Sequence, residues 1–359
     1  MGLFDFLGSN ESLIAVDVGS SYIKLIELDI TGSTPKLVNI GIAPLSGEVF
    51  SNNMISDIDY VSDQVTTLLE NNGVEDRRVI TAMPGPSVFT KKIKMANMDQ
   101  EELANNIQFE ASNFIPHSID DVQLDYHLIG DTSGKQLDIL VVAVKNEIID
   151  SFIEALALAG LEAAVVDVDY FALQNVFETN YPELKDETVA LINMGSRYSS
   201  INICRGGESL FTGDISIGGS LFTEAIQTEM GVSEEDAEQL KTDGAEGEDQ
   251  GTVKDIIDRN IEYAASEFNR QLSFFWNASG AEDGIDRIML TGGGSLIEGL
   301  REELSEKTGL ECESLDPFKA IECDEDFDSA YLKEISPLMS VSVGLGIRQP
   351  GDKDNVSGA

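Results

Sequence analysis

The sequence predicts an α/β protein built from two related halves that face one ligand. The stretches 13–28 (LIAVDVGSSYIKLIEL) and 189–204 (VALINMGSRYSSINIC) repeat one pattern of strand, Gly-Ser turn and strand, 176 positions apart. A third glycine-rich turn, Gly292-Gly293-Gly294, stands between an apolar strand and a helical pattern. The segments between these turns alternate strand and helix patterns, as α/β proteins do.

Along the first half, the spacing of apolar residues predicts the elements in order. After the first hairpin we expect a strand over 35–42, a helix over 55–70 and a strand over 79–83. Pro84-Gly85-Pro86 ends that strand and marks a boundary. Beyond it the sequence predicts an insert with its own small α+β core: strand 88–95, helix 99–114, strands 123–129 and 137–144, and helix 147–159.

The second half is predicted in the same way. We expect a strand over 163–168 and a helix over 170–178 before the second hairpin, which is followed by a strand pair ending at 217. The remaining expected elements are helices over 220–230, 233–241 and 253–278, a strand over 285–290, a helix over 296–307 and an apolar closing segment over 338–347.

Composition excludes some classes of partner. At 359 residues the chain suits two domains. Its net charge of −42 argues against nucleic-acid binding and against docking on anionic lipid, since both need basic surface. Three unpaired cysteines indicate a reducing compartment, and there is no apolar run long enough to span a bilayer and no signal-peptide pattern. We therefore expect a cytoplasmic protein without direct membrane insertion.

The duplicated turns indicate phosphate binding. Aligned without a gap, Asp17 meets Asn193, Gly19 meets Gly195, Ser20 meets Ser196 and Tyr22 meets Tyr198. A tight Gly-Ser turn presents backbone N–H groups and hydroxyls to an anion at close range. Two such turns could hold a polyphosphate from both sides. The triple glycine would let a flat base or a sugar approach the backbone, with a favourable helix N-terminus behind it.

These motifs and their order resemble the actin-like, sugar-kinase and Hsp70 superfamily, and within it the PilM and FtsA branch. DVGSSYIK (17–24) resembles the first phosphate loop, NMGSRYSS (193–200) the second, and LTGGGSLIEGL (290–300) the adenosine loop. GGSLFTEAI followed by EEDAEQLK resembles the segment that supplies a Glu and a Lys beside the ribose. The resemblance implies an actin-like (RNase H-like) two-domain fold with a 1C-type α+β insert.

On that resemblance the domains divide as follows. Residues 1–83, 160–184 and 335–350 would form domain 1A, 84–159 the inserted subdomain 1C, 185–225 and 285–334 domain 2A, 226–284 subdomain 2B, and 351–359 a disordered tail.

The resemblance also implies ATP and Mg²⁺ as cofactors. Asp17 would hold the metal through water, and Asp17, Asp167 and Asp169 are the candidate catalytic residues. Asn193 stands where the superfamily often has Asp, which removes one charge from the metal site and favours slow or absent hydrolysis. The residues expected to bind the nucleotide are Gly19, Ser20, Ser21, Lys24, Asn193, Gly195, Ser196, Arg197, Ser199, Ser200, Gly218, Gly219, Glu238, Lys241, Gly292, Gly293, Gly294 and Ser295.

Two segments resemble PilM more than FtsA: the sequence of the insert (IQFEASNFIPHSIDDVQLDYHLIG, 107–130) and the closing segment SVSVGLGIRQ (340–349). The family resemblance implies a cytoplasmic scaffold at the inner membrane that contacts other pilus platform proteins and binds the N-terminal tail of a PilN-like protein at subdomain 1C. The candidate contact residues are Lys91, Lys92, Lys94, Phe109 and Phe114.

Other interpretations remain open from the sequence. The lysines of 91–94 could instead protect a solvated strand edge from aggregation. An FtsA-like filament protein would form polymers with ATP that can be pelleted, although the tail GDKDNVSGA has no aromatic residue and only one basic residue, unlike an amphipathic membrane helix. A small-molecule kinase of the same superfamily would release a phosphorylated product.

Overall fold

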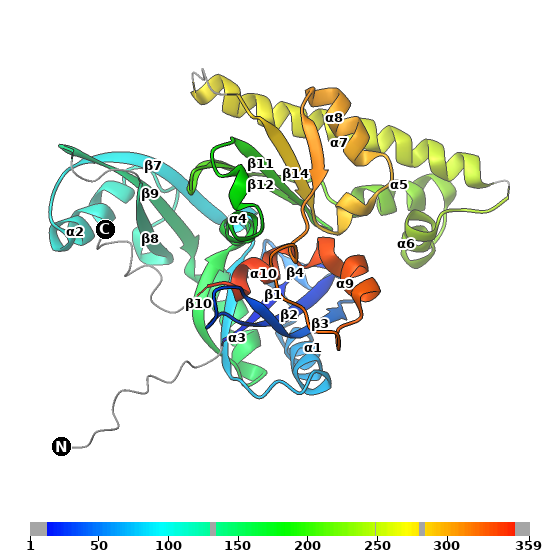
Figure 1. Cartoon of the computed structure of the whole chain (residues 1–359), viewed down its shortest axis with the longest axis horizontal. Coiled ribbons are helices and arrows are strands. Elements are labelled where there is room, and N and C mark those ends of the chain that lie inside the picture. The colour runs from blue at the N-terminus through cyan, green and yellow to red at the C-terminus, as the bar shows by residue number, and fades with distance from the viewer. Residues whose placement is uncertain (1–12, 130–133, 248, 280–283, 349–359) are drawn as a thin grey trace.

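The computed structural model describes residues 13–129, 134–247, 249–279 and 284–348. The first twelve residues and the predicted disordered tail, 351–359, lie outside this range. Within the described residues the chain forms two five-stranded sheets, one three-stranded sheet and a short strand pair (Figure 1). The prediction of an α/β protein with two similar halves and an inserted subdomain is confirmed.

The two large sheets share one strand order. The first sheet, read from its β3 edge, has the order β3-β2-β1-β6-β10, and the second has the order β13-β12-β11-β14-β15. Numbered along its own half, each sheet therefore has its strands in the order third, second, first, fourth, fifth. The first comprises β1 (Ile14–Val18), β2 (Tyr22–Asp29), β3 (Lys36–Pro44), β6 (Arg78–Met83) and β10 (Glu162–Val168). The second comprises β11 (Val189–Met194), β12 (Ser199–Arg205), β13 (Glu208–Ile215), β14 (Arg287–Thr291) and β15 (Glu311–Ser314).

The repeated hairpins also pair in the same register. Val18 faces Ile23 across the first hairpin, and Met194 faces Ser199 across the second, which is the same pair displaced by the repeat length. The N–H of the turn glycine donates to the tyrosine carbonyl at 3.0 Å in both hairpins. The sequence repeat is therefore a structural duplication.

Helices cover the outer faces of both sheets (Figure 1). In the first half, α1 (Ile58–Asn71) packs against α3 (Asn146–Leu158), and apolar residues of both helices share one core with β1 and β2. In the second half, α7 (Asp249–Ser279) and α8 (Leu300–Thr308) cover the sheet, while α5 (Ser220–Met230) and α6 (Glu234–Asp243) pack together beside α7. Apolar stripes at helical spacing make these helices amphipathic.

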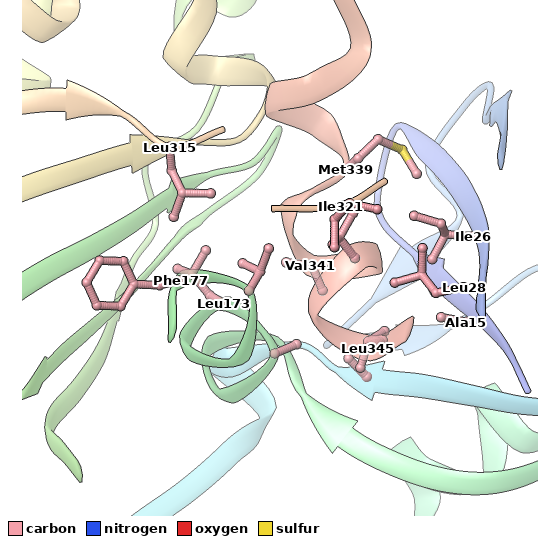
Figure 2. Packing of buried hydrophobic residues seen from close by; sticks show 14 of the residues in the cluster. Ala15, Ile26, Leu28, Leu173, Phe177, Leu315, Ile321, Met339, Val341 and Leu345 are labelled. Carbon is pink, nitrogen blue, oxygen red and sulfur yellow. The ribbon is translucent and has the colours of Figure 1, made fainter. Parts of the chain in front are cut away.

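Two helices lie between the halves. The helix α4 (Asp169–Asn180) packs along α10 (Ser340–Gly346), and one buried core joins both sheets through them (Figure 2). Gly344 permits this close crossing, because a Cβ there would overlap the backbone carbonyl of Ala172. The helix pair fixes how the two sheets face each other.

The insert is a three-stranded antiparallel sheet with one helix on it. The helix predicted over 147–159 as part of the core of the insert is α3, and it packs instead in the core of the first sheet with α1, because its apolar side faces that sheet. Its strands β7 (Val88–Ala96), β8 (Val122–Ile129) and β9 (Gln136–Lys145) have the order β7-β9-β8. Leu103 and Ile107 of α2 (Gln100–Ala111) pack with Ile139 and Val141 of the central strand. Alternation along the strands leaves the opposite face of this sheet without a helix of the insert.

The structure differs from prediction after the triple glycine. The expected helix over 296–307 begins only at Leu300, because a short helical turn (Gly293–Leu296) intervenes. Both the N–H and the Oγ of Ser295 donate to the Gly292 carbonyl and close that turn, and Gly299 resets the chain with φ of 91°. The N-terminus of a helix therefore does not stand directly behind the triple glycine.

Several short elements carried too little periodicity to be predicted. The described residues include α9 (Ser329–Ile335), the strand pair β4 (Phe50–Ser51) and β5 (Met54–Ile55), and 3₁₀ turns at Gly85–Ser87, Ile119–Asp121, Pro182–Leu184 and Ser336–Leu338, besides the edge strand β15.

Candidate nucleotide site

The first glycine turn has a lysine directly beneath it. Lys24 of β2 is paired with Asp17 of β1, and its Nζ lies 2.9 Å from the Asp17 Oδ2. A Cβ on Gly19 would lie 2.9 Å from the same Nζ. Each of the two charged side chains is 14% exposed, so this cation is held at the turn and not on the open surface.

The second glycine turn rests on the start of α5. The N–H of Gly219 donates to the Gly195 carbonyl, and the N–H of Ser220 to the Ser196 carbonyl, both at 2.9 Å. A Cβ on Gly218 would overlap the Ser196 carbonyl, so only glycine lets these two segments meet. The structure thus brings Gly195, Ser196, Gly218 and Gly219 together, as the sequence predicts.

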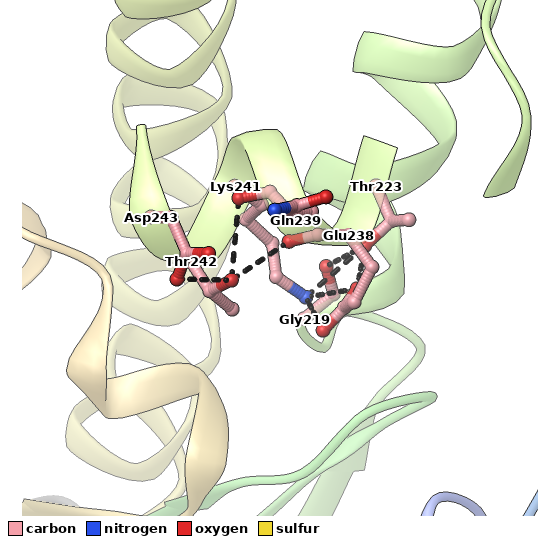
Figure 3. Close-up of polar contacts among 7 residues, drawn as sticks. All are labelled: Gly219, Thr223, Glu238, Gln239, Lys241, Thr242 and Asp243. Carbon is pink, nitrogen blue, oxygen red and sulfur yellow. Dashed lines mark hydrogen bonds and ion pairs between the residues drawn. The ribbon is translucent and has the colours of Figure 1, made fainter. Parts of the chain in front are cut away.

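A second lysine stands beside this turn (Figure 3). Lys241 Nζ lies 2.6 Å from both carboxylate oxygens of Glu238 and donates to Thr223 Oγ1 at 3.1 Å. A Cβ on Gly219 would lie 3.5 Å from this Nζ. The Lys241 side chain is 12% exposed. Each half therefore places one enclosed, carboxylate-paired ammonium next to a glycine turn.

The triple glycine packs on the end of β11. A Cβ on Gly292 would overlap the backbone of Met194 and lie 2.5 Å from Asn193 Oδ1, and Gly294 packs on the Met194 side chain. Gly293 differs, because it is exposed and the nearest atom to a Cβ there is Leu338 Cγ at 4.0 Å. The middle glycine is thus the position where a ligand could approach the backbone.

Strand alternation aims the repeated acid and amide toward the same space. Asp17 follows Ala15 on one face of β1, and Asn193 follows Leu191 on one face of β11. Ala15 and Leu191 belong to the core built around α4 and α10. Asp17 and Asn193 therefore lie at the carboxyl ends of their strands, on the faces that the two sheets turn toward each other.

Asp169, the first residue of α4, connects the first half of the chain with the second glycine turn. Its Oδ2 accepts a hydrogen bond from the Tyr198 hydroxyl at 3.0 Å. Burial raises the pKa of this carboxyl from 3.8 to about 7, and the charge of Asp17 adds to the effect. Asp167 is placed differently, because its Oδ2 accepts from Arg348 Nη1 at 2.8 Å next to the end of α10.

The comparisons with known proteins agree with this geometry. The sequence model of the type IV pilus assembly protein PilM matches residues 15–350. The chain belongs to the PilM family. It is 27% identical to a chain of a solved PilM-PilN type IV pilus biogenesis complex, with a TM-score of 0.85, covering 94% of this chain and 99% of that one.

More distant structures share the fold of this PilM-family chain. The ethanolamine utilization protein EutJ from Carboxydothermus hydrogenoformans is 16% identical, with a TM-score of 0.57 over 93% of this chain and 88% of that one. MreB5 of Spiroplasma citri, solved with AMPPNP, is 11% identical, with a TM-score of 0.55 over 97% and 98%. The predicted actin-like fold is confirmed. None of the helices in the described part is both long enough and apolar enough to cross a bilayer.

Some predicted ligands of this PilM-family protein lie inside the sheet. Ser199 and Ser200 are fully buried in β12, and Ser199 Oγ donates to the Ile217 carbonyl at 2.7 Å. Arg197 is exposed, and its Nη1 reaches the Phe50 carbonyl of the other half at 3.5 Å. The remaining turn residues, Ser20, Ser21 and Ser295, are half-buried.

The sequence reasoning missed two residues of the site. Thr223 joins Glu238 and Lys241, with its Oγ1 2.6 Å from Glu238 Oε2. Tyr198 holds Asp169. The repeat brings Tyr198 into line with Tyr22, but Tyr22 is 39% exposed. The repeat pattern alone therefore gave no signal that one of the two tyrosines has an acidic partner.

The donor set fits a nucleotide better than a protein-held metal. Glycine turns, enclosed ammonium groups and an open middle glycine match the phosphates and the base of a nucleotide. The described residues contain no cluster of three or more His, Cys, Asp or Glu side chains that could hold a metal ion. A magnesium ion beside Asp17 would therefore depend on phosphate oxygens and water for its other ligands.

The candidate peptide-binding residues divide between the two faces of the insert sheet. Lys91 points to the face of α2, with its Nζ 4.5 Å from the ring centroid of Phe114. Lys92 and Lys94 lie on the other face of the sheet. Burial lowers the pKa of Lys92, and the nearby negative charge of Glu208, in the β12–β13 hairpin, opposes that shift. Phe109 of α2 is 70% exposed.

Proposed function

We propose that this PilM-family chain is an ATP-binding scaffold of the type IV pilus platform that holds the N-terminal cytoplasmic tail of a PilN-like protein. One observation supports the proposal most directly. The glycine turns at Gly19 and Gly195 and the triple glycine 292–294 all lie at the carboxyl ends of strands in two sheets that face each other. The partner is inferred from the similar chain, which was solved in a PilM-PilN complex.

In this proposal each part of the site takes one part of the nucleotide. The turns at Gly19 and Gly195 hold the phosphates, with Lys24 as the nearby cation. Glu238 and Lys241 stand beside the ribose, and the base approaches the backbone at Gly293. Asp17 holds Mg²⁺ through water and the phosphate oxygens complete its shell.

We propose slow or absent hydrolysis. Of the two equivalent positions in the repeat, only Asp17 is charged, because the other is Asn193. Asp17 already forms an ion pair with Lys24. Asp167 and Asp169 are the candidates for positioning water, and both already have partners: Asp167 accepts a hydrogen bond from Arg348, and Asp169 accepts one from the Tyr198 hydroxyl. Attack by water needs a positioned acceptor and strong charge compensation, and this arrangement supplies little of either.

The partner tail is proposed to bind at the insert. Phe109 offers a large exposed apolar surface there, and β8 is an edge strand whose outer hydrogen-bonding groups face away from β9. An extended peptide gains affinity from main-chain pairing at such an edge and from apolar side-chain contacts. Through this tail and other platform proteins the chain would lie at the cytoplasmic face of the inner membrane.

Two titrations test the proposal. Calorimetry with Mg-ATP should give one site, and a labelled peptide from the start of the adjacent pilus-operon protein should bind with saturation. Phe109→Ala should weaken the peptide at least about tenfold, because exposed aromatic anchors dominate such contacts. Phe274→Ala, at an aromatic that is 48% exposed on α7, is the matched control and should leave peptide affinity unchanged. Absence of both binding events would refute the scaffold.

A further inference from the structure

The side chain of Tyr198 departs from the symmetry of the repeat, although its backbone follows that symmetry. Both turn tyrosines accept the glycine N–H through their carbonyls at 3.0 Å, so both hairpins close alike. Only the Tyr198 side chain reaches across the halves, to Asp169 at 3.0 Å, whereas Tyr22 is 39% exposed. The hydroxyl of Tyr198 therefore serves something other than the turn.

Asp169 is also in contact with the point where the insert begins. Gly85 opens the first turn of the insert, and a Cβ there would lie 3.1 Å from Asp169 Oδ1 and 3.2 Å from the Tyr170 ring. This Oδ1 is buried and has no hydrogen-bond partner among the described residues, so its closest surroundings on this side are the start of the insert. One buried carboxyl thus touches the second glycine turn on one side and the insert on the other.

A second contact at the same junction ties the insert to the second half. Thr90 of β7 and Thr212 of β13 share a hydrogen bond of 2.9 Å between their hydroxyls. The Tyr170 hydroxyl is buried next to this pair. A shift of β12 and β13 would therefore reach β7 both through the side chains at the start of α4 and directly through the threonines.

We infer that the Tyr198–Asp169 hydrogen bond couples the second glycine turn to the insert, so that nucleotide binding changes the affinity for the partner peptide. The inference rests on the proposed function. A phosphate that accepts the N–H groups of Gly195 and Ser196 competes with the Tyr198 carbonyl for the Gly195 N–H. The tyrosine backbone then moves, and its hydroxyl carries the movement to Asp169 and Gly85.

The test compares peptide affinity with and without Mg-ATP. In the parent protein the two affinities should differ by at least about fivefold, the lower end of ordinary coupling between sites. Tyr198→Phe removes the hydroxyl and keeps the ring, and should bring the ratio below about twofold. Tyr22→Phe is the matched control and should keep the parent ratio. A parent ratio of one, or an equal ratio in Tyr198→Phe, overturns the inference.

A double-mutant cycle distinguishes loss of the Tyr198–Asp169 hydrogen bond from a nonspecific loss of stability. Asp169→Ala should lower the same ratio, and the double variant should lower it no further, because the two residues act as one unit. Additive effects would contradict the coupling. If Asp169→Ala fails to fold, the comparison of Tyr198→Phe with Tyr22→Phe still tests the inference.

Hydrogen exchange in the ligand-free protein gives a readout that needs neither ATP nor peptide. The backbone amides of Gly85 and of residues 87–90 should exchange faster in Tyr198→Phe than in Tyr22→Phe, because the insert loses one of its contacts with the second half. Equal exchange would overturn the inference. Missing binding isotherms in the parent would instead refute the proposed function, so the two failures are distinguishable.

Discussion

The Nζ of Lys24 lies 2.9 Å from the Oδ2 of Asp17, directly beneath the glycine turn that joins their two strands. In a chain with 65 acidic and 23 basic residues, an enclosed cation at a glycine turn is a local exception. The pair both neutralises Asp17 and places positive charge where the phosphates are proposed to lie.

Lys24→Ala is expected to weaken ATP binding by about tenfold or more, because a charge-assisted contact to phosphate is worth about 1.5–3 kcal/mol. Calorimetry measures the change. Lys254→Ala, which breaks an exposed ion pair with Asp258 on α7, is the control and should bind ATP as the parent does. Unchanged affinity in Lys24→Ala would mean that the first turn does not hold phosphate.

Gly293→Val is expected to block the base without unfolding the chain. The position is exposed, and the nearest atom to a Cβ there is Leu338 Cγ at 4.0 Å, an ordinary contact without overlap, so the fold should accept the side chain. ATP affinity should fall at least about tenfold by steric exclusion, while the melting temperature changes by no more than a few degrees. Gly32→Val, in an exposed turn of the first half, is the control. Tight ATP binding by Gly293→Val would place the base elsewhere.

Gly344→Ala is expected to destabilise the whole protein. The added methyl would overlap the Ala172 carbonyl and force α10 away from α4, and overpacking of this kind costs about 1–3 kcal/mol or more. Chemical denaturation should show the loss. Gly251→Ala in α7, where a Cβ meets open space, should leave stability equal or raise it by up to about 1 kcal/mol. Equal stability of the two variants would contradict the observed helix crossing.

The buried Asp169 carboxyl predicts a specific pH dependence. Its pKa is about 7 in the folded protein, above the ordinary 3.8, mainly because burial disfavours the charge. The folded state therefore holds this proton more tightly than the unfolded state, and the contribution to stability is lost as pH rises from about 4 through 7.

Asp169→Asn removes this titration and keeps an acceptor for Tyr198. Relative to the parent, the variant should gain stability as pH rises from 4 to 7, by at most about 4 kcal/mol at 1.36 kcal/mol per pKa unit. Denaturation at several pH values in high salt measures the difference while screening the acidic surface. Parallel stability curves for the two proteins would show that the carboxyl titrates normally.

Much of the fold could be predicted from patterns of neighbouring residues. The duplicated hairpins, the boundary at Pro84-Gly85-Pro86 and the helix over 220–230 follow from strand alternation, turn residues and helical spacing, which act over a few positions. The predicted helix over 220–230 coincides with α5. The family motifs in these segments added the fold, and the family match over residues 15–350 agrees with it.

Other parts of the site depend on contacts between distant segments. No local pattern distinguishes Tyr198 from Tyr22, because the difference lies in whether a carboxyl from α4 stands opposite the ring. Likewise, the division of Lys91 and Lys92 between two faces of the insert sheet follows from pleating once the strand is paired.

The sequence by itself determined the repeat, the glycine turns and the family, since each is written in consecutive residues. Only the tertiary structure decided which residues far apart in the sequence meet: Asp169 with Tyr198, Asp167 with Arg348, and Gly344 with the backbone of Ala172. These meetings depend on how α4 and α10 cross inside a shared core, and that crossing is set by packing over the whole chain.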